Sequence, residues 1–192
     1  MQAVWYRSNG SARDVLEQVA LPIPEPRPGE VRVRLAFSGI NPSDVKSRAG
    51  SRPVVSEYVI PHSDGAGVID AVGPGVPVER IGQPVWVWNA QYGRRDGTAA
   101  QYVALPGEQA VSLPDGVSLA EGAALGIPAL TAAHAVTLAG LGTERTVLVT
   151  GGASNVGFYA AQFARQLGAR VDGRPGCRCR DRSGFFEQQR FD

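Results

Sequence analysis

The chain has 192 residues, of which 43% are apolar and 19% are charged, and its formal net charge is +1. This length allows one domain, or one domain and part of a second, and the composition is typical of a globular rather than a disordered protein. The nearly balanced charge excludes the strongly basic surface that nucleic acid or an anionic membrane would require.

Other features of the sequence bear on cellular location. No apolar run reaches the roughly 20 residues of a membrane-spanning helix, and the N-terminal stretch MQAVWYRSNG lacks the pattern of a signal peptide. The only cysteines, Cys177 and Cys179, stand two positions apart, so no disulfide framework is possible. These features predict a cytoplasmic protein with no membrane partner.

Residues 1–117 have the pattern of an all-β domain. Short apolar or alternating runs, bounded by Gly and Pro, predict strands, and they fall at 31–40, 65–73, 84–90, 98–106 and 109–114. The stretch 42–50 predicts one short helix that ends at Gly50. Short strands at this spacing are typical of a small closed barrel.

The pattern becomes helical at Ser118. Ser118 and Glu121 form the S-x-x-E sequence of a capping box, in which each residue satisfies a backbone N–H of the other. Helical spacing follows to Gly126, and a second helix is predicted from Pro128 to Gly140. These helices separate the β-rich segment from the segment that follows.

Residues 146–171 predict the first β–turn–α unit of a doubly wound parallel sheet. The strand 146–150 has an unbroken apolar centre, as a buried parallel strand does. Gly168 is placed to end the next helix, and 169–171 begins a second strand. One face of that helix is predicted to be apolar, and it holds Val156, Ala160, Phe163, Ala164 and Leu167.

The turn between this strand and helix is a candidate dinucleotide site. Such a site needs glycines for a tight turn, for close approach of the pyrophosphate and for helix–strand packing. The segment reads Gly151, Gly152, Ala153, Ser154, Asn155, Val156 and Gly157. Ser154 stands where glycine is usual, and its hydroxyl and the Asn155 amide could donate to a phosphate. Without context, an ordinary glycine-rich turn is an equally good interpretation.

Periodicity is lost in residues 172–192. The segment has five arginines and both cysteines but no strand pattern, so the doubly wound sheet is expected to be incomplete. One interpretation is a natural disordered tail. We favour the other, a shifted reading frame or an artificial end near residue 171, which out-of-frame reading of the gene would test.

Residues 1–171 resemble the zinc-independent quinone oxidoreductases of the medium-chain dehydrogenase/reductase superfamily, the zeta-crystallin-like group. The resemblance rests on PEPRPGEVRVRLAFSGINPSDVKSRAG, IPHSDGAGVIDAVGPGV, GTAAQYVALP, LPDGVSLAEGAALGIPALTAAHA and the glycine-rich turn, in family order. It implies an α+β and α/β chain: a GroES-like catalytic barrel at 1–117, linking helices and the start of a Rossmann domain at 118–171, and a non-homologous tail at 172–192.

The resemblance also implies a chemistry, which is hydride transfer from NADPH to a quinone or an α,β-unsaturated carbonyl. Asn41 would lie near the nicotinamide and the substrate, and Thr131 would approach the nicotinamide. The alternative for Thr131 is a helix residue that bonds its own backbone. Asp44 is expected to cap its short helix rather than act in catalysis. Full-length relatives are expected to be homodimers.

The same positions argue against zinc. Where zinc-dependent relatives carry ligands, this sequence has Asn41, Ser63 and Ile127, and these side chains cannot supply three converging ligands. His62 and His134 are expected to be ordinary surface or helix residues. Any metal binding by Cys177 and Cys179 would be incidental.

Two alternatives to an active enzyme stay open at this point. The chain could be a catalytically inactive fragment of such an enzyme, which we favour for its actual activity. It could also be a barrel that serves only as a binding or structural module.

Overall fold

The structure is a computed structural model, and it describes residues 1–174. The chain divides into two compact units, Met1–Ile127 and the part that begins at Pro128. The boundary between the barrel and the linking helices at 117/118, given in the sequence analysis, stays a prediction. The predictions for Cys177, Cys179 and most of the tail lie outside the described residues.

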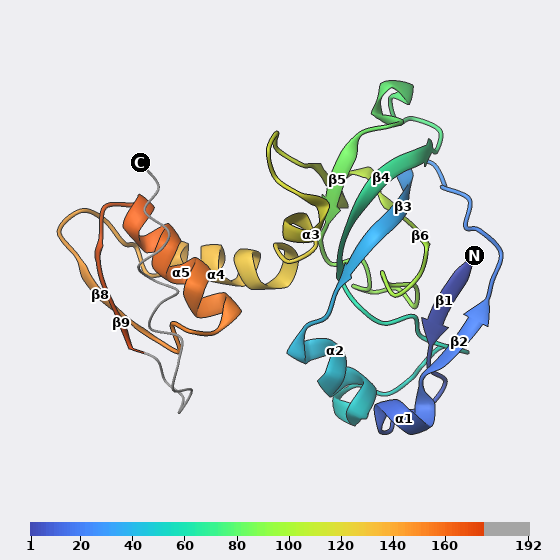
Figure 1. Cartoon of the computed structure of the whole chain (residues 1–192), viewed down its shortest axis with the longest axis horizontal. Helices are drawn as coiled ribbons and strands as arrows, with labels where there is room; N and C mark the ends of the chain where they lie inside the picture. The colour runs from blue at the N-terminus through green and yellow to red at the C-terminus, as the bar shows by residue number, and fades with distance from the viewer. Residues whose placement is uncertain (175–192) are drawn as a thin grey trace. The chain divides into compact units, whose positions relative to one another are not determined.

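The first unit is built on a five-stranded antiparallel sheet with the order β6-β3-β4-β5-β7 (Figure 1). Its strands are β3 (Glu30–Gly39), β4 (Asp64–Val72), β5 (Pro84–Val87), β6 (Tyr102–Pro106) and β7 (Ala110–Ser112). Each falls within or close to a range that the alternation of apolar residues predicts. A hairpin of β1 (Gln2–Trp5) and β2 (Glu17–Ala20), which the sequence pattern does not predict, lies beside it.

The barrel is not closed by strand pairing among the described residues, because β6 and β7 are the two edges of the sheet. Side chains bridge these edges instead. Arg94 donates to the carbonyl of Ala104 on β6 and to Oε1 of Gln109, the residue before β7, at 3.5 and 2.7 Å. Arg80 donates to the carbonyl of Ala110 on β7 at 2.5 Å. The turn Gly107–Gln109 joins β6 directly to β7, so these guanidinium groups reinforce a connection that the chain itself makes.

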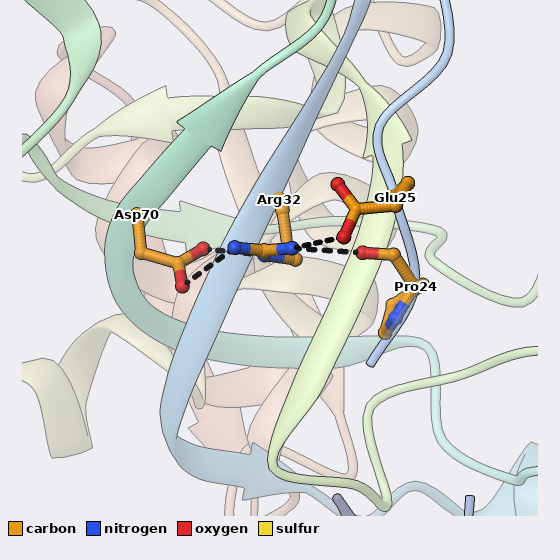
Figure 2. A network of polar contacts seen from close by, with 4 residues as sticks. All are labelled: Pro24, Glu25, Arg32 and Asp70. Carbon is orange, nitrogen blue, oxygen red and sulfur yellow. Dashed lines mark hydrogen bonds and ion pairs between the residues drawn. The ribbon is translucent and has the colours of Figure 1, made fainter. Parts of the chain in front are cut away.

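A second set of polar contacts fastens the segment before β3 to the sheet (Figure 2). The Arg32 guanidinium on β3 donates to both carboxylate oxygens of Asp70 on β4, at 2.9 and 3.3 Å. It also donates to the carbonyl of Pro24 and to Glu25 Oε1, at 3.2 and 3.3 Å. Arg32 is only 16% exposed, so its paired carboxylate offsets the cost of burying the charge.

Short helices follow the sheet strands. These are α1 (Ala12–Val15), α2 (Pro42–Lys46) and α3 (Leu119–Gly122), with a π-helical turn at Ser47–Ser51 and 3-10 turns at Val78–Arg80 and Gly107–Gln109. The capping box predicted at Ser118 is confirmed: Glu121 N donates to Ser118 Oγ at 3.2 Å, and Ser118 N donates to Glu121 Oε2 at 2.8 Å. Gly50 has a φ of 118°, which suits a glycine that ends a helical segment.

The second unit contains a β–α–β arrangement. The strand β8 (Thr146–Thr150) and the strand β9 (Arg170–Arg174) pair in parallel, with α5 (Asn155–Gln166) between them in sequence. Helix α4 (Gly126–Leu138) precedes them and begins two residues before the predicted Pro128. Gly168, with a φ of 83°, ends the α5 segment as predicted.

Two details of this unit differ from expectation. Leu148 at the centre of β8 is 58% exposed, so β8 is not the fully buried strand that its apolar run predicts. The buried face of α5 holds Gly157, Ala161 and Ala164, and Leu167 is 48% exposed. Of the predicted apolar face, Ala164 is buried and Leu167 is exposed, while the other three members are half-buried: Val156, Ala160 and Phe163.

The core of the first unit gives a stability test. Val85 is fully buried in the sheet core, whereas Val55 is 90% exposed. We expect Val85→Ala to lower the free energy of unfolding by about 2 kcal/mol, since it removes two buried methyl groups and leaves a cavity. The control Val55→Ala should stay within about 0.5 kcal/mol of the parent in urea denaturation. Equal losses in both variants would contradict the assigned core.

Candidate functional site

The glycine-rich turn of the second unit has the geometry of a phosphate-binding loop. Gly151 adopts a φ of 73°, a left-handed conformation that side chains disfavour. Ser154 N donates to the Gly151 carbonyl at 2.8 Å, and Ser154 Oγ accepts from Gly157 N at 3.1 Å. Ser154 is therefore the N-cap of α5. Its φ of −81° is ordinary for serine, so the fold does not require glycine there.

Gly157 is the residue that lets helix and turn approach. A Cβ at this position would lie 2.3 Å from the Gly151 carbonyl oxygen and 2.9 Å from Gly152 Cα. Gly152 is buried, Val156 is half-buried, and Ala153, Ser154 and Asn155 are exposed. The exposed residues surround the first turn of α5, whose N–H groups have no partner within the helix and attract anions. The residues present therefore fit the pyrophosphate of a dinucleotide.

A buried polar cluster forms the candidate site of the first unit. Asn41, which is 5% exposed, precedes α2, and its Nδ2 donates to Asp64 Oδ2 at 2.7 Å. Ile127 N in the first turn of α4 donates to the same oxygen at 2.8 Å. Asn41 N donates to Asp44 Oδ2 at 2.7 Å, which confirms the predicted capping role of Asp44. Three chain segments thus meet at two carboxylates.

Asp64 is the member of this cluster that sequence reasoning missed as a site residue. It is 1% exposed, and among the described residues its Oδ1 has no hydrogen-bond partner. Burial raises the pKa of the Asp64 carboxyl, while the hydrogen bonds from Ile127 and Asn41 act to lower it. The only signal in the sequence is a carboxylate placed directly before the apolar run GAGVIDAV, where burial would demand donors.

A hydrogen-bonded chain of hydroxyls lies next to this cluster. His62 Nδ1 and Ser38 Oγ are 2.8 Å apart, Ser38 Oγ and Thr98 Oγ1 are 2.8 Å apart, and Thr98 Oγ1 donates to the Asp64 carbonyl at 2.5 Å. His62 is half-buried in a loop, with a φ of 77°, and burial lowers its pKa. It is thus part of a polar network rather than a plain surface residue.

The three positions that carry zinc ligands in zinc-dependent relatives are used differently here. The Asn41 side chain and the Ile127 backbone both donate to Asp64, and the carbonyl of Ser63 accepts from Ala90 N at 2.9 Å. Within residues 1–174, no group of three or more His, Cys, Asp or Glu could hold a metal ion. The donor set does not fit a catalytic zinc, which needs three converging ligands.

Thr131 is an exposed residue on the part of α4 that belongs to the second unit. Asn41 belongs to the first unit. The hydroxyl that bonds its own helix backbone is that of Thr137, which donates to the Ala133 carbonyl at 2.9 Å. The seven predicted loop residues come together around the start of α5. The roles of Asn41 and Thr131 in binding cofactor or substrate stay predictions.

None of the helices in 1–174 has both the length and the apolar character of a membrane span.

A GroES-like barrel followed by a glycine-rich β–α–β unit is the arrangement of the medium-chain dehydrogenases and reductases, which this chain resembles. Residues 27–115 match the family model of the alcohol dehydrogenase GroES-like domain. The chain is accordingly related to the quinone oxidoreductases of this superfamily, as the sequence motifs predict.

Individual relatives give the same result. The chloroplast envelope quinone oxidoreductase homolog of Arabidopsis thaliana is 34% identical over 187 residues, which cover 93% of this chain and 56% of that protein. The quinone oxidoreductase of Homo sapiens is 33% identical over 161 residues, covering 82% and 47%. A mycobacterial structure complexed with NADPH superposes with a TM-score of 0.77 at 28% identity, covering 90% of this chain and 52% of that one. The chain spans about half the length of these relatives.

The buried position of Asp44 predicts a pH dependence of stability. Burial raises the pKa of Asp44 from 3.8 to about 6, so the folded chain holds the proton more tightly than the unfolded chain. The resulting stability is present below about pH 4 and is lost as the pH rises through 6, about 3 kcal/mol in total.

The test compares the free energy of unfolding of the parent with that of Asp44→Asn. The difference, parent minus variant, should fall by about 3 kcal/mol between pH 4 and pH 7.5. Asparagine keeps an acceptor for Asn41 N but does not titrate, and Asp64 titrates in both proteins. Urea denaturation at the two pH values measures the difference. An unchanged difference would show that Asp44 ionises in the fold as it does in water.

Proposed function

We propose that the chain acts as an NADPH-dependent oxidoreductase that transfers hydride to a quinone or an α,β-unsaturated carbonyl, without zinc. The observation that carries the proposal is the Gly151–Gly157 turn, capped by Ser154 at the start of α5. The relationship to quinone oxidoreductases and the likeness to an NADPH complex support the choice of cofactor and acceptor. The natural setting is proposed to be the cytoplasm.

The residues of the turn would bind the cofactor through its phosphates. The first turn of α5 offers N–H groups and the positive end of the helix dipole, and the exposed Ser154 hydroxyl and Asn155 amide can add donors. When bound, the nicotinamide supplies the hydride. Thr131 on α4 is proposed to contact it.

Asn41 is proposed to orient the acceptor. An amide nitrogen carries two hydrogens, and Asp64 Oδ2 accepts only one of those on Asn41 Nδ2. The second hydrogen is free to donate to a substrate carbonyl, on whose oxygen negative charge develops as hydride is transferred. Conjugation in a quinone or enone stabilises that charge, so positioning by the protein can suffice without a Lewis acid.

The cofactor site is tested by titrating the purified chain with NADPH and following nicotinamide fluorescence. Gly157→Ala should weaken binding at least about tenfold, because its Cβ would lie 2.3 Å from the Gly151 carbonyl oxygen and must displace the turn. Gly142→Ala is the matched control, since a Cβ there meets nothing within 4 Å. NADH in place of NADPH tests the choice of nucleotide.

Saturable NADPH binding by a folded parent chain, lost in Gly157→Ala, supports the oxidoreductase. If the folded parent binds no nucleotide, the proposal fails, and a barrel that acts only as a binding module or an inactive relative becomes the better interpretation.

The role of Asn41 is tested separately by quinone reduction. Asn41→Ala removes one donor to the acceptor oxygen, so we expect kcat/KM to fall by about 10- to 100-fold. The dissociation constant for NADPH should change far less than in Gly157→Ala, because the Gly151–Gly157 turn is untouched. Unchanged kcat/KM would remove Asn41 from the substrate site.

A further inference from the structure

The carboxylate of Asp64 joins two segments that are far apart in the chain. Its Oδ2 accepts from Asn41 Nδ2, 23 residues away in sequence, and from Ile127 N, 63 residues away. The first donor lies just after β3 and the second in the first turn of α4. One buried oxygen thus fixes the spacing between the side-chain amide of Asn41 and the start of α4.

The side chain of Asp64 occupies space that neighbouring glycines leave open. A Cβ on Gly126 would lie 2.1 Å from Asp64 Oδ1, and a Cβ on Gly39 would lie 3.0 Å from Asp64 Cβ. The main chain of Asp64 is held as well, because its carbonyl accepts from Thr98 Oγ1. Gly126 thus makes room for the carboxylate, and Thr98 holds the main chain of Asp64.

The hydrogen bonds of Asp64 also decide which way the Asn41 amide is turned. The oxygen and nitrogen of an amide have similar shapes, and their positions are decided by hydrogen-bond partners. A carboxylate oxygen that already accepts from the Ile127 N–H can only accept from its other neighbour, so the nitrogen of Asn41 must face Asp64. Without that acceptor the amide could rotate and present its oxygen, which repels a carbonyl.

We propose that Asp64 is a positioning residue, which ties Asn41 to the first turn of α4 and sets the amide so that its second Nδ2 hydrogen is presented to the acceptor carbonyl. The part that concerns the acceptor rests on the proposed function. The part that concerns the two hydrogen bonds does not.

The structural part is tested with Asp64→Leu, which removes the acceptor at similar volume, and Asp64→Asn, which keeps one acceptor oxygen. The readouts are amide hydrogen exchange at Ile127 and at the Asn41 side chain, followed by NMR on the full chain. In Asp64→Leu, exchange at Ile127 should be at least about tenfold faster relative to Ile69, whose buried amide in β4 reports the general stability of the unit. In Asp64→Asn, the ratio of Ile127 to Ile69 exchange should remain close to that of the parent.

Asp70→Asn is the control, because Asp70 lies on the same strand and bonds Arg32 rather than Asn41. It should leave the ratio of Ile127 to Ile69 exchange unchanged. If Asp64→Leu does not fold, Gly126→Ala, whose Cβ displaces Oδ1, should give the same local increase. Slow exchange at Ile127 in a folded Asp64→Leu chain would overturn the proposal.

The functional part is read from quinone reduction. Asp64→Leu should lower kcat/KM by the same factor as Asn41→Ala, and the double variant should be no slower than either, because both act on one amide. The dissociation constant for NADPH should change far less than in Gly157→Ala, and Asp64→Asn should restore most of kcat/KM. If the fold-loss of activity in the double variant equals the product of the two single losses, Asp64 does not act through Asn41. If the parent reduces no quinone, the proposed function fails, while the exchange measurements still decide the role of Asp64.

Discussion

The burial of a carboxylate at the beginning of β4 is a constraint on which the packing of the first unit depends. A carboxylate that is 1% exposed must find hydrogen-bond donors within the fold. Asp64 obtains them from Asn41 and from the first turn of α4, and this choice brings the end of β3 against the start of that helix. Gly126 follows from it, because a Cβ there would lie 2.1 Å from Asp64 Oδ1.

The second unit obeys a different constraint, the close contact of a helix with the turn before it. Gly157 lies against the Gly151 carbonyl, and Ser154 caps the helix between them. The hydrogen bond from Gly157 N to Ser154 Oγ stabilises the start of α5, where the proposed phosphate site lies. Local stability and the proposed nucleotide binding therefore depend on the same few residues.

The edges of the sheet show how polar side chains reinforce connections that strand pairing does not make. Arg94 and Arg80 connect β6, β7 and Gln109, while Arg32 ties the preceding segment to β3 and β4. The composition shows many arginines and a balanced charge, but it does not show that these guanidinium groups serve the barrel. Several of their partners are backbone carbonyls, which carry no signature in a sequence.

The sequence by itself determined the features that depend on local chemistry: the strands near 30–39 and 64–72, the capping box at Ser118, the strand 146–150, the glycine-rich turn and the end of α5 at Gly168. Alternation, caps and glycine conformations act over a few residues, so they can be read in order along the chain. Only the tertiary structure decided which face of α5 is buried, how the barrel edges are joined, and that Asp64 holds Asn41. These features depend on residues up to 63 positions apart, and no local pattern specifies which buried carboxylate will meet which donor.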